Sequence, residues 1–289
     1  MSPVIADLIR AAAGDQPGAA PGGAPGPAGA GLTGGAAAAR SAFPDWKFAP
    51  NIGGHPDIYE VENQAVDSAG HVLAAMRALV PWDGRTLVDL GCGSGFWLSR
   101  YAENAAEVIG IEPDPALRTA ATARAARLRR TTVLAGSAER LPLPARSADV
   151  VHARFAYFLS PGGDAGLAEV MRVLRPGGSL VVVDNDHRWG QFAELLAGAS
   201  ATGPDRTAAA ADAWWRERGA VRIQVRSELR FRSRAELAAV LHIELPATVA
   251  RSWLARNPAA TGLTYGYVLF AVQRAASGSA SRAVADGPR

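Results

Sequence analysis

Two hydrophobic patterns alternate along the middle of the chain. Short apolar runs rich in valine, isoleucine and threonine predict strands, and the stretches between them, whose apolar positions recur every three or four residues, predict helices. Such alternation is typical of parallel βαβ units. Two more apolar runs follow towards the C-terminal end. The predicted strands cover residues 86–90, 107–112, 131–135, 149–153, 179–184, 221–229 and 265–273.

Local signals indicate where the helices begin and end. One helix is expected to start near Phe96. Asp114 can cap the next helix by accepting backbone N–H bonds, and Pro115 suits its first turn. A third helix over residues 165–174 is expected to end at R-P-G-G, residues 175–178, because proline and two glycines turn the chain into the fifth strand.

The composition predicts a soluble globular protein. With 289 residues and 48% apolar content, the chain can form one or two domains. Cys92 is the only cysteine, which excludes a disulfide framework and a cysteine-based zinc cluster and favours a cytoplasmic location. No apolar run reaches the roughly 18 residues that a membrane span needs, and the N-terminus lacks the features of a signal peptide.

Both ends of the chain are expected to be disordered. Between residues 11 and 40, 25 of 30 residues are Ala, Gly or Pro, without apolar periodicity. Such a segment buries too little surface to offset the entropy of ordering it. The sequence therefore predicts a disordered leader over residues 1–42 and a disordered tail over residues 275–289.

The charge gives little support for a nucleic-acid partner. The formal net charge is +3, and Lys47 is the only lysine beside many arginines. The densest basic run, residues 124–130, could track phosphates or form the solvated face of a helix, and the helix face is the favoured interpretation. We therefore expect no nucleic-acid partner.

The sequence V-D-L-G-C-G-S-G, residues 88–95, places three glycines at every second position behind the first predicted strand. Ligands bind at this end of a parallel strand. Gly91, Gly93 and Gly95 can adopt positive φ angles, and they lack the Cβ atoms that would keep a ligand from the backbone. A dinucleotide site would have a small residue in place of Phe96, and no G-K-[ST] follows. The turn therefore does not require a phosphate.

Five ordered elements resemble those of class I S-adenosylmethionine-dependent methyltransferases, especially the small-molecule branch that modifies quinones and natural products. The resemblance covers residues 84–186 and extends more weakly into the flanks. It implies an α/β fold with a doubly wound, Rossmann-like sheet of seven strands, mostly parallel with the last strand antiparallel, and helices on both faces. The elements are V-D-L-G-C-G-S-G, G-I-E-P-D-P, A-G-S-A-E-R-L-P-L-P, A-D-V-V-H-A-R-F-A-Y-F-L and V-M-R-V-L-R-P-G-G-S-L-V-V-V-D.

The resemblance also divides the chain into parts. It implies a methyltransferase domain over residues 81–274, preceded by a helical cap segment over residues 43–80. The cap segment either helps to form the acceptor pocket or simply packs on the sheet. A helical insertion over residues 190–219 is expected on the acceptor side. Its paired Trp214 and Trp215 suit a flat hydrophobic substrate, but they are also ordinary core residues.

The implied cofactor is S-adenosylmethionine, which presents an amino-acid end, a sulfonium ion, a ribose and an adenine. The resemblance places Asp89 near the methionine ammonium and Glu112 on the ribose hydroxyls, as an acidic residue does in dinucleotide folds. Ser137 stands where many relatives have an aspartate that accepts the adenine amino group, and its neutral hydroxyl is the weaker acceptor. The implied cofactor-binding residues are Asp89, Gly91, Cys92, Gly93, Gly95, Glu112, Pro113, Ser137, Ala138, Glu139 and Ala153.

Methyl transfer from a sulfonium ion depends mainly on alignment and desolvation, and a general base is needed only when the nucleophile arrives protonated. The candidate bases are His187, Tyr157 and His152, although His152 lies mid-strand and packing is its favoured alternative. The Asp-Asn pair at residues 184–185 is similar to a metal-binding pair of catechol O-methyltransferases. Arg154 occupies the place of their further aspartate, and its cation would repel a metal, so we expect no metal site.

We expect a methyltransferase that acts on an O, N or C atom of a small hydrophobic or aromatic molecule. An RNA or protein methyltransferase is one alternative, supported only by the arginines, since no appended RNA-binding module or N-P-P-Y-like motif is present. A non-catalytic cofactor-binding domain is the other, because cofactor binding alone does not establish catalysis. The oligomeric state is left open.

Overall fold

The computed structural model describes residues 42–44, 46–158, 163–199 and 204–276. The expected leader over residues 1–42 lies outside the described residues except for its last one. Of the expected tail over residues 275–289, only the first two residues are described. The two disorder predictions therefore stay predictions.

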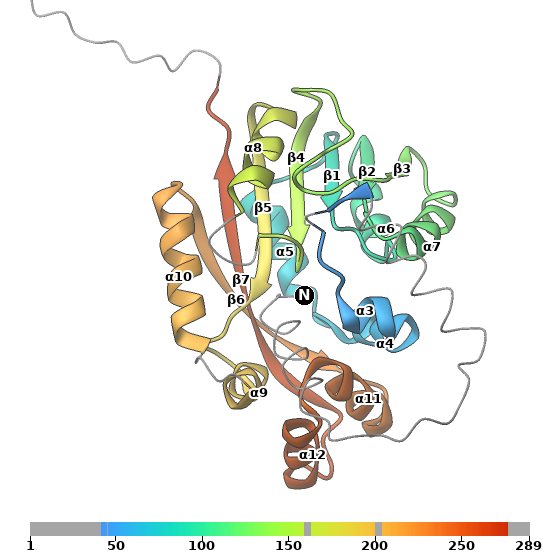
Figure 1. Ribbon diagram of the computed structural model, residues 1–289, viewed down its shortest axis with the longest axis vertical. Coiled ribbons are helices and arrows are strands. Elements are labelled where there is room, and N and C mark those ends of the chain that lie inside the picture. The colour runs from blue at the N-terminus through green and yellow to red at the C-terminus, as the bar shows by residue number, and fades with distance from the viewer. Residues whose placement is uncertain (1–41, 45, 159–162, 200–203, 277–289) are drawn as a thin grey trace, which may run out of the picture.

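The strands form a single sheet whose topology confirms the predicted fold class. They are β1 Thr86–Leu90, β2 Glu107–Ile111, β3 Thr131–Leu134, β4 Ala148–Arg154, β5 Leu174–Asn185, β6 Val221–Arg230 and β7 Gly262–Gln273. Their order is β3-β2-β1-β4-β5-β7-β6, with β7 antiparallel to both of its neighbours and the other pairs parallel (Figure 1). Because β1 to β5 are parallel, their carboxyl ends and the loops after them meet at one edge of the sheet.

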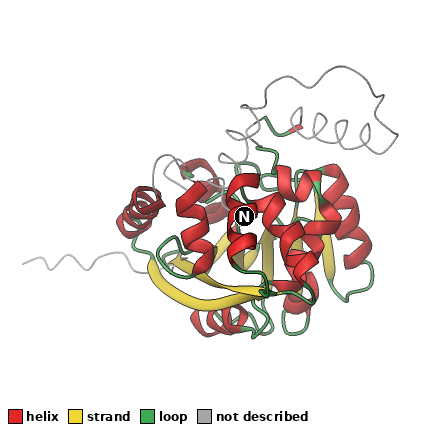
Figure 2. Cartoon of the chain, turned by 90° about the horizontal axis from the view of Figure 1, so that it is seen from below, coloured by secondary structure: helices red, strands yellow, loops and turns green. Residues whose placement is uncertain are grey.

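Helices cover both faces of the sheet (Figure 2). The described helices are α3 Pro50–Gly54, α4 Pro56–Ala65, α5 His71–Leu79, α6 Leu98–Ala102, α7 Pro115–Ala125, α8 Asp164–Val173, α9 Gln191–Ala199, α10 Pro204–Glu217, α11 Arg234–Glu244 and α12 Ala247–Arg256. Met76 of α5 and Leu98 of α6 are buried on one face, together with Leu87 of β1. Val170 of α8 is buried on the other face with Val88, because successive strand residues point to opposite sides. In the described part of the chain, no helix is long and apolar enough to cross a membrane.

The cap predicted for α7 is present. The Asp114 carboxylate accepts the backbone N–H groups of Ala116 at 2.8 Å and of Leu117 at 3.1 Å, and Pro115 opens the helix. A side chain that accepts these bonds satisfies donors that the first turn otherwise leaves free. Asp114 therefore fixes the start of α7 directly beside the carboxyl end of β2.

The predicted turn over residues 175–178 is part of β5 instead. α8 ends at Val173, and β5 begins at the next residue. Backbone hydrogen bonds pair this segment with the residue that follows β7. The Gly177 N–H donates to the carbonyl of Arg274 at 3.0 Å, and the Arg274 N–H donates to the carbonyl of Gly178 at 2.8 Å. The pairing with β4 shifts register here, so the prolyl-glycine sequence forms an irregularity within a strand rather than a separate turn.

The paired tryptophans are core residues. Trp214 and Trp215 are 7% and 2% exposed, and the Trp215 ring stacks on Phe270 of β7 with centroids 5.5 Å apart. They hold α10 against the sheet, on the face that α8 also covers. Of the two interpretations offered by the sequence, packing is therefore favoured over a flat substrate pocket.

Two helices between β6 and β7, α11 and α12, were not predicted. Leu237 and Leu241 of α11 and Trp253 of α12 are buried. α11 packs against α4 (Figure 1). This contact brings a helix from the end of the chain beside the cap segment from its beginning.

Candidate active site

The glycine turn after β1 has the backbone conformation that its sequence predicts. The φ angle is +73° at Gly91, +57° at Gly93 and +79° at Gly95, in a region that other residues rarely adopt. A Cβ atom on Gly91 would lie 2.5 Å from the Cβ of Ala156, and one on Gly95 would lie 2.9 Å from the Cα of Ala121. The turn is therefore closed against α7 and against the segment after β4, where only glycine fits.

Glu112, directly after β2, joins this turn to the start of α7. One carboxylate oxygen accepts the Gly93 N–H at 2.9 Å, and the other accepts the Asp114 N–H at 2.9 Å. The side chain is buried, and burial raises its pKa to about 7 although the two backbone bonds lower it. Each carboxylate oxygen can accept one more hydrogen bond. The group can therefore bind two neighbouring hydroxyls of a ligand.

Asp89 supplies a second buried carboxyl group at the same edge. It lies near the end of β1, in register with His152 of β4. Burial raises its pKa to about 7, and the positive charge of Arg154 opposes this shift. A buried carboxyl group is ionised most readily when a cation comes close, so Asp89 suits an ammonium group.

The loop after β3 reaches this edge as well. The Glu112 N–H donates to the carbonyl of Leu134 at 3.1 Å, which aligns the ends of β2 and β3. Ser137 and Ala138 are buried, and Glu139 is half-buried. The structure thus brings the loops after β1, β2 and β3 together, as the resemblance implies. We call this part of the edge, with Asp89, the glycine turn, Glu112 and Ser137, the β1–β3 side.

The other three residues implied in cofactor binding have less direct positions. Cys92 is buried within the turn, and burial raises the pKa of its thiol. Pro113 is buried, and its carbonyl accepts a hydrogen bond from Arg118 at 3.0 Å. The Ala153 side chain lies in the core on the face opposite Asp89. Only the backbone of Ala153 is therefore available on the Asp89 side.

His152 lies in the core, which favours its packing interpretation over a role as a base. It is fully buried, with its ring centroid 5.2 Å from that of Trp82 and 5.1 Å from that of Tyr101. Neither ring nitrogen has a hydrogen-bond partner among the described residues, and burial lowers the pKa to about 3. A neutral histidine enclosed by two aromatic rings cannot reach an acceptor.

Tyr157 and His187, the other candidate bases, pack on the face of the sheet opposite Asp89. The Tyr157 hydroxyl accepts the Gly166 N–H at 3.1 Å, in the first turn of α8. His187 lines a small cavity together with Asp212 of α10, and burial lowers its pKa. The structure therefore does not bring these two residues together with the β1–β3 side, and their role as bases stays a prediction.

The Asp-Asn pair after β5 does not form a chelate. Asp184 lines the cavity on the α10 side, whereas Asn185 accepts a hydrogen bond from the Tyr265 hydroxyl on the other side. Successive residues of a strand point to opposite faces, which separates the two side chains. Within the described residues, no group of three or more His, Cys, Asp or Glu side chains could hold a metal ion.

The sequence analysis missed two further features, and the first is a buried carboxyl pair between the cap segment and α11. Glu62 of α4 is 7% exposed and Glu244 of α11 is 1% exposed. Burial raises the pKa of Glu244 to about 7, and burial together with the nearby Glu244 raises the pKa of Glu62. Asn51 donates a hydrogen bond to Glu244 at 2.8 Å. No local sequence pattern could indicate this pair, because its members come from opposite ends of the chain.

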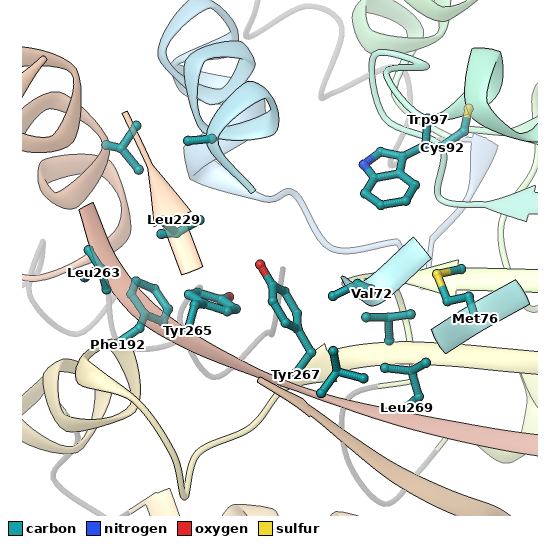
Figure 3. Packing of buried hydrophobic residues seen from close by; sticks show 14 of the residues in the cluster. Val72, Met76, Cys92, Trp97, Phe192, Leu229, Leu263, Tyr265, Tyr267 and Leu269 are labelled. Atoms are coloured by element: carbon teal, nitrogen blue, oxygen red, sulfur yellow. The ribbon is translucent and has the colours of Figure 1, made fainter. Parts of the chain in front are cut away.

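The second missed feature is a group of polar and aromatic side chains around the end of β4, to which α6 contributes Trp97 from its start. The Arg154 guanidinium lies 4.4 Å from the centroid of the Trp97 ring and 5.5 Å from that of Phe155. The Phe155 ring lies 6.0 Å from that of Tyr267 on β7. Figure 3 shows Trp97 and Tyr267 with their polar atoms directed towards the same region. We call Arg154, Trp97, Phe155 and Tyr267 the β4–β7 side of the edge.

Comparisons with known proteins agree with this geometry. A family profile described as a methyltransferase domain matches residues 88–182. An uncharacterized methyltransferase of Mycobacterium bovis is 38% identical over 124 residues, 42% of this chain and 49% of the relative. A demethylmenaquinone methyltransferase of Lactococcus lactis is 28% identical over 137 residues, 45% and 54% of the two chains. The solved structure of the YcgJ protein of Bacillus subtilis matches with a TM-score of 0.51 and 15% identity, over 71% of this chain and 98% of that one.

These comparisons apply to the part of the chain that holds the site. The chain spans about half the length of the curated relatives it matches. The matched residues include the glycine turn, Glu112 and β4. The solved structure, at 15% identity, supports the fold alone. Residues 88–182 are thus similar to a methyltransferase domain, and the sheet topology agrees with the fold that the resemblance to class I S-adenosylmethionine-dependent methyltransferases implies.

Proposed function

We propose that the protein transfers the methyl group of S-adenosylmethionine to a small-molecule acceptor. The observation that carries this proposal is the convergence of the glycine turn with two buried carboxyl groups, Asp89 and Glu112, at one edge of the sheet. Carboxyl groups and an open backbone suit a ligand that carries an ammonium group and a ribose. Phosphates would instead call for basic groups or a helix N-terminus.

The residues of the β1–β3 side fit this cofactor part by part. Asp89 would hold the methionine ammonium, and Glu112 would accept the ribose hydroxyls. Ser137 and the backbone of Ala138 would contact the adenine. Glu112 already binds the Gly93 N–H, so its carboxylate fixes the turn in the shape that the cofactor needs, which reduces the entropy lost on binding.

The chain's contribution to the reaction is binding, orientation and exclusion of water. When bound, S-adenosylmethionine supplies a methyl group that is already activated as a sulfonium. Asp89 at the end of β1 and Glu112 at the end of β2 would fix the direction in which that methyl group points, and the next strand along the edge is β4. An acceptor held at the end of β4, beside the bound cofactor, would gain the orientation that is the main requirement of the transfer.

A small molecule is the acceptor class that the observations favour. A relative that is 28% identical over 137 residues is named a demethylmenaquinone methyltransferase, and menaquinone precursors are small and hydrophobic. The cap segment over residues 43–80 would help to form the pocket, because Ile52 of α3 lies against the glycine turn, 3.0 Å from the position of a Cβ atom on Gly93. The arginines remain the only feature in favour of an RNA or protein acceptor.

Calorimetric titration of the purified protein with S-adenosylmethionine, and with NADH as the contrasting ligand, tests the proposal. We expect S-adenosylmethionine to bind with micromolar affinity, about −8 kcal/mol, and NADH not to bind. Binding of NADH alone would contradict the assignment of the glycine turn. A screen of aromatic and quinone-like acceptors for release of S-adenosylhomocysteine then separates an enzyme from a cofactor-binding domain.

A further inference from the structure

The β4–β7 side contains hydrogen-bond donors that lack acceptors. The indole N–H of Trp97 and the hydroxyl of Tyr267 are buried, in residues that are 3% and 1% exposed, and neither donor has an acceptor among the described residues, although the Tyr267 oxygen lies beside the backbone N–H of Asp67. The half-buried Arg154 makes no ion pair with any described carboxylate and instead stacks on Trp97 and Phe155. Buried polar groups without partners are uncommon and need an explanation.

The carboxyl groups around Arg154 are occupied elsewhere. Asp67 accepts hydrogen bonds from the N–H groups of Val72 and Leu73 and from the Ser227 hydroxyl. Glu62 is next to Glu244, and burial together with this neighbouring carboxyl group raises the pKa of Glu62, which disfavours its charged form. Asp89 would hold the ammonium of the cofactor. The guanidinium charge is therefore not neutralised by the protein itself.

The backbone after β4 is strained where it carries these groups. Phe155 and Tyr157 have φ angles of +51° and +60°, which bulky residues rarely adopt and which cost about 1 to 3 kcal/mol each. Between them, Ala156 lies against the glycine turn at Gly91. The strained segment places Arg154 beside the cofactor turn and the Phe155 ring between Arg154 and Tyr267.

From these observations we propose that the methyl acceptor carries an anionic oxygen group, a carboxylate or an ionised hydroxyl, that binds to Arg154, Trp97 and Tyr267. The inference rests on the proposed function, because it takes the β1–β3 side as the cofactor site. Arg154 offers several N–H donors and no acceptor, and the Trp97 indole is a donor only. Donors without acceptors match an anionic group more closely than a neutral or cationic one, and the Phe155 ring between Arg154 and Tyr267 suits an aromatic acid.

The positions of these hydrogen-bond donors along the edge of the sheet indicate that they bind the methyl acceptor rather than the cofactor. Along the edge of the sheet, the order is Ser137 after β3, Glu112 after β2, Asp89 on β1 and then Arg154 on β4. Tyr267 lies two strands beyond Arg154, on β7. The cofactor would occupy the first three positions, so a ligand that bridges Arg154 and Tyr267 lies on the far side of the methyl group.

Binding of benzoate, with benzamide as its neutral counterpart, tests the proposal. The full-length protein is titrated with each in a calorimeter, both without cofactor and saturated with S-adenosylhomocysteine. We expect benzoate to bind at least 10-fold more tightly than benzamide. Arg154→Met should remove this preference, and Arg154→Lys should retain part of it, because lysine keeps the charge but not the planar array of donors.

Further variants separate the donors from the fold. Trp97→Phe and Tyr267→Phe keep their rings and should weaken benzoate binding roughly 3- to 10-fold. Arg100→Met is the matched control, because Arg100 also stacks on Trp97, at 5.0 Å, from α6. It should leave the ratio of benzoate to benzamide affinity unchanged. Thermal unfolding of each variant verifies that it is folded.

Several outcomes would overturn the inference. One is an equal affinity of the wild-type protein for benzoate and benzamide, including failure to bind either. Another is an Arg154→Met variant that keeps the preference for benzoate. If Arg154→Met instead weakens S-adenosylmethionine binding at least 10-fold and keeps the preference, the arginine binds the carboxylate of the cofactor. Failure of the wild-type protein to bind S-adenosylmethionine would contradict the proposed function, and the titrations without cofactor would still test Arg154.

Discussion

The two sides of the candidate site differ in how their polar groups are satisfied. On the β1–β3 side, Glu112 already accepts two backbone N–H groups, and the residues come from a stretch of about fifty positions. On the β4–β7 side, the Trp97 indole N–H and the Tyr267 hydroxyl have no acceptors among the described residues, and β4 and β7 are far apart in the chain. The β1–β3 side is preformed by the backbone, whereas the β4–β7 side holds donors that we propose a ligand satisfies.

This difference predicts where each side is sensitive to mutation. A preformed turn fails when its backbone is changed, because no alternative conformation keeps the same hydrogen bonds. A side whose polar groups find their partners in a ligand tolerates substitutions while the protein is unbound. Their effect then appears as a loss of affinity for the ligand. Buried polar groups without partners also reduce stability.

The largest effect is expected at Gly91. Gly91→Ala adds a Cβ atom 2.5 Å from that of Ala156, at a φ angle of +73°, so strain and overlap together cost about 3 kcal/mol. Calorimetry should show a roughly 100-fold loss of S-adenosylmethionine affinity. Gly70→Ala is the matched control, because Gly70 has the same φ angle of +73° with no atom near its Cβ position. If Gly91→Ala bound the cofactor normally, the turn would not be the cofactor site.

Glu112 should have the next largest effect. Glu112→Ala removes a carboxylate that we place on the ribose and that also holds the Gly93 N–H, and the expected loss of cofactor affinity is about 1.5 to 3 kcal/mol. The control is Glu107→Ala, an exposed glutamate at the opposite end of β2. An unchanged dissociation constant in a folded Glu112→Ala protein would exclude the ribose role.

The carboxyl pair between the cap segment and α11 should act on stability. The folded-state pKa of Glu244 is raised to about 7 from an ordinary value near 4.5. Its contribution to stability is therefore fully present below the ordinary pKa and is lost as the pH rises through about 7. At pH 8, the Glu244→Gln variant should therefore be more stable than the wild-type protein, with a free energy of unfolding roughly 1 to 2 kcal/mol higher.

Denaturant titrations between pH 5 and pH 8 measure this effect. The difference between Glu244→Gln and the wild-type protein should grow with pH, because the glutamine cannot ionise. Glu103→Gln, an exposed glutamate after α6, serves as the control and should follow the wild-type curve. A constant difference across the pH range would show that Glu244 does not titrate on unfolding.

The smallest expected effect is that of metal removal. EDTA should leave methyl transfer unchanged, because Asp184 and Asn185 face opposite sides of the sheet and Arg154 stands at the end of β4. Release of S-adenosylhomocysteine, measured with and without EDTA once an acceptor is known, tests this expectation. A loss of turnover that magnesium restores would show that a metal site forms with the substrate.

The sequence by itself determined most of the β1–β3 side of this protein. The alternation of strand and helix patterns predicts the parallel βαβ units, and the positive φ angles at Gly91, Gly93 and Gly95 confirm the turn. Asp114 caps α7 as predicted. These features were predictable because each depends on residues that are close in sequence, where backbone conformation, capping and periodicity are encoded locally.

Only the tertiary structure decided which residues from distant segments meet. It brings Glu62 beside Glu244 and places Tyr267 near Phe155, and it buries His152 between two aromatic rings. The irregular start of β5 also depends on its partners, β4 and β7. Contacts between distant segments depend on how whole layers of helices and strands pack. The hydrophobic pattern around a single residue indicates whether it is buried, but not which distant residue it will contact.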